Sequence, residues 1–211
     1  TAKYFMPRLL AQFSQAHPGI EVQFSVGNRE SLLQKLQDNA IDLAVMGRIP
    51  VEIDAHAEPL ASHPYVLIGP ADHPLRSGRR FDFHELRHET FLLREEGSGS
   101  RRVAEEMFKN HLFKPARTIS MGSNETIKQA VMAGMGIALI SLHTLPLELK
   151  TAEVSVLDVI GTPIERTWYV VHMNSKRLLP AGQRFRQFLL EQAAPGLERE
   201  FGRYLSASTA S

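Results

Sequence analysis

Apolar positions along the chain switch between a spacing of three to four residues and a spacing of two. Residues 6–13 carry apolar side chains at i, i+3, i+4 and i+7, which predicts a helix that Pro18-Gly19 ends. Residues 20–26 then alternate apolar and polar, which predicts a strand. A second short helix is expected over residues 32–36, with Asn28 or Ser31 as its cap.

The same switching continues to the end of the chain. Strands are predicted at 43–46, 64–69, 90–94, 118–121, 136–141 and 167–172, and helices at 101–110, 125–133 and 181–192. Strands that alternate with helices favour an α/β fold with mostly parallel sheets. The polar stretch 70–80 is expected to be an interdomain crossing or an exposed loop, and residues 207–211 are expected to fray.

Composition narrows the function classes. The 211 residues include 24 Lys and Arg against 23 Asp and Glu, and this net charge of +1 argues against a nucleic-acid module. The absence of cysteine excludes disulfides, thiol catalysis and Cys-ligated metal. No apolar run approaches the roughly 18 residues that span a bilayer. The chain opens without Met or a signal peptide, so we expect a piece of a longer protein.

One segment matches a zinc-protease pattern. In H-E-x-x-H, His84 and His88 would bind zinc and Glu85 would act as a general base, which makes a zinc-dependent hydrolase one alternative. The segment is short, is charged on several sides and runs directly into a strand. These features favour a solvated surface helix with Phe83 and Leu86 inward.

A Gly/Ser turn at residues 94–102 lies between a predicted strand and a predicted helix. Backbone N–H groups at a helix start bind anions, with help from the helix dipole. Ser98 and Ser100 add hydroxyl donors, and Arg101 adds a fork suited to carboxylate or phosphate. The alternative is an ordinary connection with Ser as the N-cap. The turn matches neither the P-loop, nor G-x-G-x-x-G, nor G-x-S-x-G.

Three other turns follow predicted strands, at residues 27–29, 46–48 and 122–125. In open α/β sheets, ligands bind outside the carboxyl ends of strands. Together these turns are rich in hydrogen-bond donors and cations and poor in paired catalytic groups. They therefore favour binding an anionic small molecule over transforming it, although turn chemistry alone also accounts for each residue.

Several stretches, in this order and spacing, resemble the effector-binding domain of LysR-type transcriptional regulators. They are TAKYFMPRLLAQF with HPGI, DLAVMGR at 42–48, MAGMGIALIS at 132–141 and WYVVH at 168–172. The resemblance extends from Thr1 to about residue 192. Residues 46–50 and 94–101 are most similar to the Calvin-cycle regulators that control the RuBisCO operon, although that branch more often has Pro at Glu96 and Thr at Ser100.

The resemblance implies a periplasmic-binding-protein-like (type 2) fold, in which two Rossmann-like lobes are joined by two crossover strands. Residues 1–62 and 168–211 would form lobe I, and residues 63–167 would form lobe II. The inducer would lie between the lobes. The residues carried over to the cleft are Thr1, Asn28, Met46, Gly47, Arg48, Ser98, Gly99, Ser100, Arg101, Ser123 and Asn124.

The resemblance also implies a cytoplasmic, non-enzymatic sensor without a cofactor or a metal. Its effector would be a sugar bisphosphate such as ribulose bisphosphate, phosphoenolpyruvate or NADPH. DNA would be contacted only through an N-terminal winged helix-turn-helix outside this chain, and full-length relatives form dimers and tetramers without a membrane partner. A stand-alone solute-binding protein is the remaining alternative.

Overall fold

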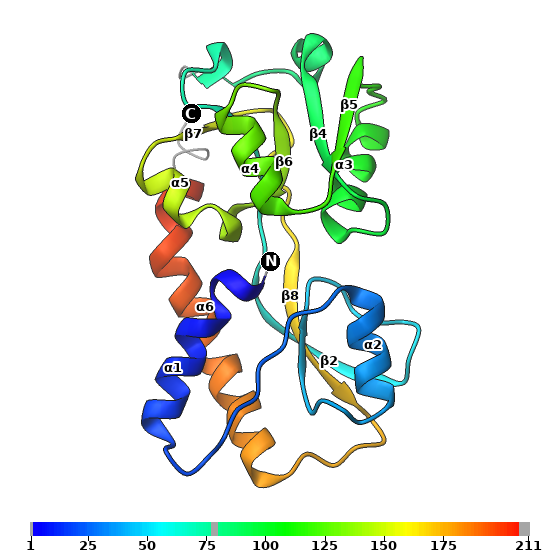
Figure 1. The fold of residues 1–211 in the computed structure, drawn as a ribbon, viewed down its shortest axis with the longest axis vertical. Coiled ribbons are helices and arrows are strands. Elements are labelled where there is room, and N and C mark those ends of the chain that lie inside the picture. Colours follow the sequence, from blue (N-terminus) through cyan, green and yellow to red (C-terminus); the bar gives the residue numbers. More distant parts are fainter. Residues whose placement is uncertain (1, 77–79, 207–211) are drawn as a thin grey trace. The chain divides into compact units, whose positions relative to one another are not determined.

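The chain divides into two compact units. Unit 1 comprises Thr1–His63 and Arg166–Gly202, and unit 2 comprises Pro64–Glu165 and Arg203–Ser211. The computed structural model shown in Figure 1 describes residues 2–76 and 80–206, so the tail predicted to fray lies outside the described residues. The described residues of the stretch expected to be a crossing or a loop, 70–76 and 80, belong to unit 2, so the interpretation as a crossing between the units is wrong.

Unit 1 is built on an antiparallel sheet with the order β1-β8-β2. Its strands are β1 (Ala44–Met46), β2 (Ala55–Ser62) and β8 (Thr167–Met173). Its helical elements are η1 (Ala2–Tyr4), α1 (Met6–Ala16), α2 (Arg29–Gln37) and α6 (Pro180–Ser206), the last of which ends in unit 2. The predicted apolar face of α1 is buried at Met6, Leu9 and Phe13, and Asn28 rather than Ser31 caps α2.

The strand predicted over residues 20–26 is wrong. Within the described part of the chain, residues 20–26 have no regular secondary structure and join no sheet. Phe24 is 44% exposed and Val26 is 59% exposed, so its apolar side chains bury too little surface to fix a register. Alternation is a signal of a half-buried strand, and here the burial is missing.

Unit 2 contains an antiparallel sheet, β6-β3-β7, and a parallel pair, β4-β5. The strands are β3 (Tyr65–Pro70), β4 (Thr90–Arg94), β5 (Arg117–Met121), β6 (Ala138–Ser141) and β7 (Val154–Leu157). The helical elements are η2 (Pro74–Arg76), η3 (Phe83–His88), α3 (Gly99–Asn110), α4 (Asn124–Met132), η4 (Leu142–Thr144) and α5 (Pro146–Lys150). A cluster of phenylalanines, Phe83, Phe91, Phe108 and Phe113, forms much of the core.

The expectation of mostly parallel sheets is also wrong, although the α/β class is right. Among the described strands only β4 and β5 form a parallel ladder, because β8 and β3 each run antiparallel to both of their neighbours. The order of strands and helices along the chain does not determine whether strands pair parallel or antiparallel. The direction depends on which strands become neighbours in the folded sheet. The pattern also missed β2, which Pro59 interrupts, and the short β7.

Candidate anion-binding site

The helices α3 and α4 begin at the same edge of the β4-β5 ladder (Figure 1). The strands are parallel, with Arg94 opposite Met121 at their carboxyl ends. A short turn leads from each strand into its helix, with Ser98 at the N-cap position of α3 and Ser123 at that of α4. The first N–H groups of both helices have no partner within their own helix, so this edge concentrates donors and positive helix-dipole ends.

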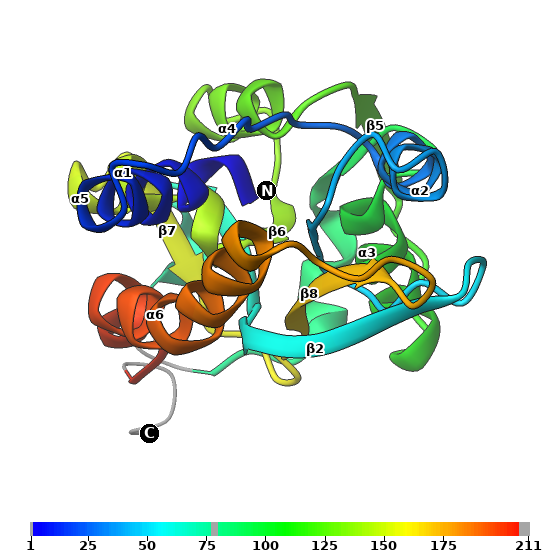
Figure 2. The ribbon, with the colours of Figure 1, turned by 90° about the horizontal axis from the view of Figure 1, so that it is seen from below.

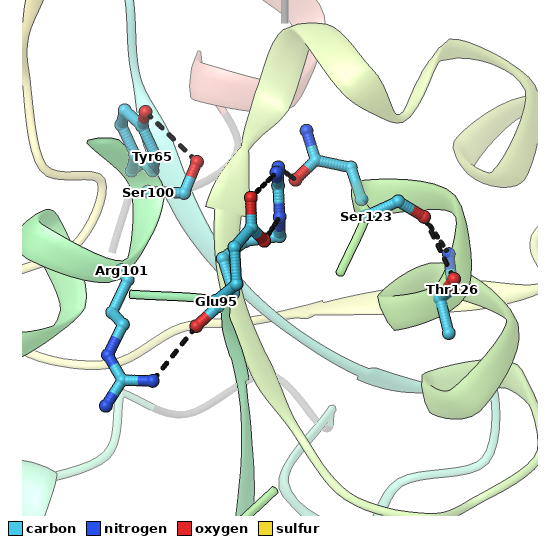
Figure 3. Close-up of polar contacts among 8 residues, drawn as sticks. Tyr65, Glu95, Ser100, Arg101, Ser123 and Thr126 are labelled. Atoms are coloured by element: carbon cyan, nitrogen blue, oxygen red, sulfur yellow. Dashed lines mark hydrogen bonds and ion pairs between the residues drawn. The ribbon is translucent and has the colours of Figure 1, made fainter. Parts of the chain in front are cut away.

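The two N-cap serines are used differently. Ser123 Oγ accepts a hydrogen bond from the Thr126 N–H at 3.0 Å and lies 2.9 Å from Thr126 Oγ1 (Figure 3). Ser98 follows Gly97, whose φ of +81° favours glycine, and its side chain makes no capping hydrogen bond within the described structure. Ser98 therefore occupies the N-cap position without the hydrogen bond that an ordinary capping serine makes. Its hydroxyl can instead donate to another acceptor.

Arg94 connects the end of β4 to the start of α4. Its Nη1 donates to Asn124 Oδ1 at 2.8 Å, and its Nε and Nη2 each donate to the Glu95 carboxylate at 2.6 Å (Figure 3). Asn124 is only 4% exposed, so this contact holds a buried amide in place. The hydrogen bonds from Arg94 lower the pKa of Glu95, which therefore stays ionised and has little capacity as a general acid.

Arg101 and Ser100 lie on the first turn of α3. The Arg101 guanidinium donates through Nη1 to the Arg94 carbonyl at 3.2 Å (Figure 3). It also donates through Nε to Glu105 at 2.7 Å. The fork that the sequence predicted for a ligand is thus held by groups of the chain itself. Ser100 is buried, and its Oγ lies 3.5 Å from the Tyr65 hydroxyl.

The site residues predicted in unit 1 each have a local role there. Asn28 Oδ1 accepts from the Ser31 N–H at 2.9 Å, and Met46 is buried in the core. A Cβ at Gly47 would lie 3.2 Å from the His63 ring, so this close approach requires glycine or a shift of the ring. Arg48 has an exposed side chain, and its carbonyl accepts from Arg29.

Thr1 lies outside the described residues. That all the predicted residues contact one ligand stays a prediction. Sequence reasoning missed Arg94 as a site residue, although its place at a strand's carboxyl end is the signal that selected the others. Tyr65 starts β3 and carried no such signal.

The H-E-x-x-H segment lies on η3, a 3-10 helix. With 3.0 residues per turn, positions i and i+4 point about 120° apart, so His84 and His88 do not converge as they would on an α-helix. Glu85 accepts from the Asp82 N–H at 3.0 Å in a capping box. Phe83 and Leu86 are buried as expected. The geometry gives the zinc-hydrolase alternative no support.

The chain forms two α/β units, each built from two separate segments. Its structural neighbours are ligand-binding regulatory domains, and together these features define a periplasmic-binding-protein-like domain of type 2. The model of the LysR substrate binding domain matches residues 1–194, and the chain belongs to this family. The family resemblance and the fold class inferred from the sequence are thereby confirmed.

Among curated relatives, the HTH-type transcriptional regulator CfxR of Cupriavidus necator is 63% identical over 202 residues, which are 96% of this chain and 64% of the relative. The RuBisCO operon transcriptional regulator of Allochromatium vinosum is 45% identical over 194 residues, which are 92% of this chain and 64% of the relative. The chain thus spans just under two thirds of the length of these relatives. They confirm the similarity to regulators of the RuBisCO operon.

One solved structure is similar in both sequence and fold. The regulatory domain of CcmR from Synechocystis PCC6803, in complex with 2-PG, superposes with a TM-score of 0.84 at 40% identity, over 90% of this chain and 91% of that one. The BenM effector binding domain with benzoate has a TM-score of 0.77 at 16% identity and supports the fold alone. None of the helices in the described residues is long and apolar enough to cross a membrane.

Proposed function

We propose that this chain is the effector-sensing part of a transcriptional regulator of carbon-fixation genes, and that it catalyses no reaction. The regulators to which it is similar support this role. Glu95, in the turn that leads from β4 into α3, is held ionised by Arg94, which is unfavourable for acid catalysis. DNA is contacted by a domain outside this chain, in a cytoplasmic homo-oligomer.

The effector is a small phosphorylated anion, and 2-phosphoglycolate is the first candidate. The observation that carries this proposal is the convergence of the N-termini of α3 and α4 at one edge of the parallel β4-β5 ladder. A phosphate there accepts backbone N–H groups of the first turns and the hydroxyl of Ser98. The neighbour that holds 2-PG supports the choice of ligand class. Ribulose bisphosphate, phosphoenolpyruvate and NADPH are the other candidates.

The ligand's effect on the regulator equals its differential affinity for the two states of the domain. Arg101 offers a route to such a difference. A phosphate that binds the Arg101 guanidinium competes with Glu105 and with the Arg94 carbonyl. Binding therefore replaces contacts that Arg101 makes within unit 2 by contacts with the ligand.

Isothermal titration of the four anions tests the proposal, with Ser98→Ala as the decisive variant. Since the Ser98 hydroxyl makes no capping bond within the described chain, its removal leaves the fold intact. Loss of a hydrogen bond to a charged group costs about 1.5–3 kcal/mol, so we expect roughly 10- to 150-fold weaker binding. Arg101→Ala should weaken binding by a similar factor.

Arg102→Ala is the matched control, because Arg102 is an exposed cation on the same turn. It should leave the affinity within about threefold, because a purely long-range charge effect is screened by salt. Equal losses in the Arg101 and Arg102 variants would show a diffuse charge effect and contradict the site. So would unchanged affinity in Ser98→Ala.

A further inference from the structure

Two histidines and a glutamate share one face of the β2-β8 ladder in unit 1. His56 and Glu58 lie two residues apart on β2, so their side chains leave the same face. His172 on β8 is the direct cross-strand partner of His56. Figure 2 shows β2 alongside β8. Strand periodicity and register alone therefore bring the three side chains together.

The distances between these groups are short. His56 Nε2 lies 3.8 Å from Glu58 Oε2, and the two imidazole rings have centroids 5.4 Å apart. One ligand atom from each of the three residues lies within 4.8 Å of the others. Among the described residues, no other group of three His, Asp or Glu side chains meets this condition.

His172 is oriented for coordination. Its Nδ1 lies 3.1 Å from the Met173 carbonyl oxygen, an acceptor that places the proton on Nδ1 and leaves the Nε2 lone pair free. Metal-binding histidines characteristically donate their second ring N–H to such a carbonyl. The ring is therefore held in the tautomer in which Nε2 is available to bind a metal.

We propose that His56, His172 and Glu58 bind a divalent transition metal ion, with Zn²⁺ as the probe. Two imidazoles and a carboxylate are a three-ligand zinc set that leaves a fourth position for water. Zn–N and Zn–O bonds of about 2.0–2.2 Å require the ligand atoms to approach to about 3.4 Å in a tetrahedron. The His56 side chain is 53% exposed, so it can rotate by the small amount needed.

Arg186 on α6 competes with this ion. Its Nε and Nη2 both donate to the Glu58 carboxylate, and these bonds lower the pKa of Glu58 and keep it anionic. A bound cation faces the guanidinium across this shared carboxylate. Metal binding therefore weakens the Arg186 contact and couples the ion to the ion pair that joins α6 to β2. The site goes beyond the proposed anion sensing and involves none of its residues.

Titration calorimetry with Zn²⁺ on the metal-free 211-residue chain, and the visible spectrum of the Co²⁺ form, test the proposal. We expect one ion per chain, with affinity that falls as the pH is lowered, because protons compete with the metal for the ligand atoms. His56→Gln and His172→Gln should each lower the affinity at least about 100-fold. Loss of a residue that only supports a metal ligand lowers metal affinity by about 10- to 100-fold, so a loss of this size identifies a direct ligand. Arg186→Gln should raise it.

The double variant His84→Gln/His88→Gln is the matched control, since it removes two exposed histidines from η3 and should not change the affinity. Circular dichroism of each variant establishes that it is folded. The proposal is overturned by the absence of a one-to-one complex, by undiminished binding in a folded His56 or His172 variant, or by loss of binding in the control. An affinity that Arg186→Gln leaves unchanged would refute the competition.

Discussion

A buried ion pair in unit 2 yields a prediction that can be worked through in detail. Lys128 Nζ on α4 lies 2.7 Å from Glu148 Oε1 on α5, and each side chain is 8% exposed. Lys128 also donates to the Thr144 carbonyl at 3.0 Å. Glu148 Oε2 is buried with no hydrogen-bond partner in the described structure, so the carboxylate is only partly compensated.

Lys128→Met removes the cation and leaves the Glu148 carboxylate buried without a counter-charge. Breaking such a pair from one side costs about 3–5 kcal/mol, and the lost bond to Thr144 adds about 1 kcal/mol. A domain's free energy of unfolding is only about 5–15 kcal/mol, so this variant should be close to the limit of folding.

The double variant Lys128→Met/Glu148→Met should recover most of this loss. Replacing both charges by apolar side chains of similar volume is often neutral, or stabilising by about 1–4 kcal/mol. The unsatisfied Glu148 oxygen favours that outcome, because its desolvation cost disappears with the carboxylate. The Thr144 carbonyl still lacks its donor, so we expect stability within about 1 kcal/mol of wild type.

Urea denaturation followed by far-UV circular dichroism measures both variants, with the midpoint and the slope fitted separately. The reasoning is refuted if the single variant loses less than about 1 kcal/mol, or if the double variant loses as much as the single one. A changed slope in the single variant would instead show that the native state itself had opened.

Two further changes test the structure. Burial lowers the pKa of His143 to about 4, so the unfolded chain, with a pKa near 6.5, binds the proton first as pH falls. Wild type should therefore lose up to about 3 kcal/mol of unfolding free energy from this group between pH 6.5 and pH 4. In urea denaturation at a series of pH values, the unfolding free energy of His143→Gln should fall by that much less over the same range. Gly136→Ala should cost at least about 1–3 kcal/mol in thermal unfolding, because its Cβ would lie 2.2 Å from the Thr90 carbonyl oxygen. Gly122→Ala, whose Cβ meets no described atom within 4 Å, should be nearly neutral, and an equal cost in both variants would contradict the steric reason.

The sequence predicted the local features of unit 2 well. Gly/Ser-rich residues after β4 indicated the start of a helix, and α3 begins at Gly99. The spacing of Phe83 and Leu86 correctly placed them inward, although the helix type there was not predicted. Residues 20–26 had an equally good alternating pattern and form no strand in the described structure. An alternating pattern predicts which face of a strand would be buried, but it does not predict whether a neighbouring strand is present to pair with it.

The candidate anion site was predicted as a set of residue types at strand ends, without its contacts. Arg101 has the expected place on the first turn of α3, but its pairing with Glu105 follows from helical geometry at i and i+4. The bond from Arg94 to Asn124 spans 30 residues and depends on the parallel register of β4 and β5. No local pattern contains that register.

By itself, the sequence determined the α/β class, the family, the positions of most helices and the donor-rich turns that follow the strands. Those properties arise from local periodicity, capping and turn chemistry, which act over a few residues. Tertiary structure decided the strand directions, the 3-10 form that separates His84 from His88, and the meeting of His56 with His172, which are 116 positions apart in the numbering. Such long-range pairings depend on which strand returns beside which, because the free energy that selects them comes from burial summed over each unit.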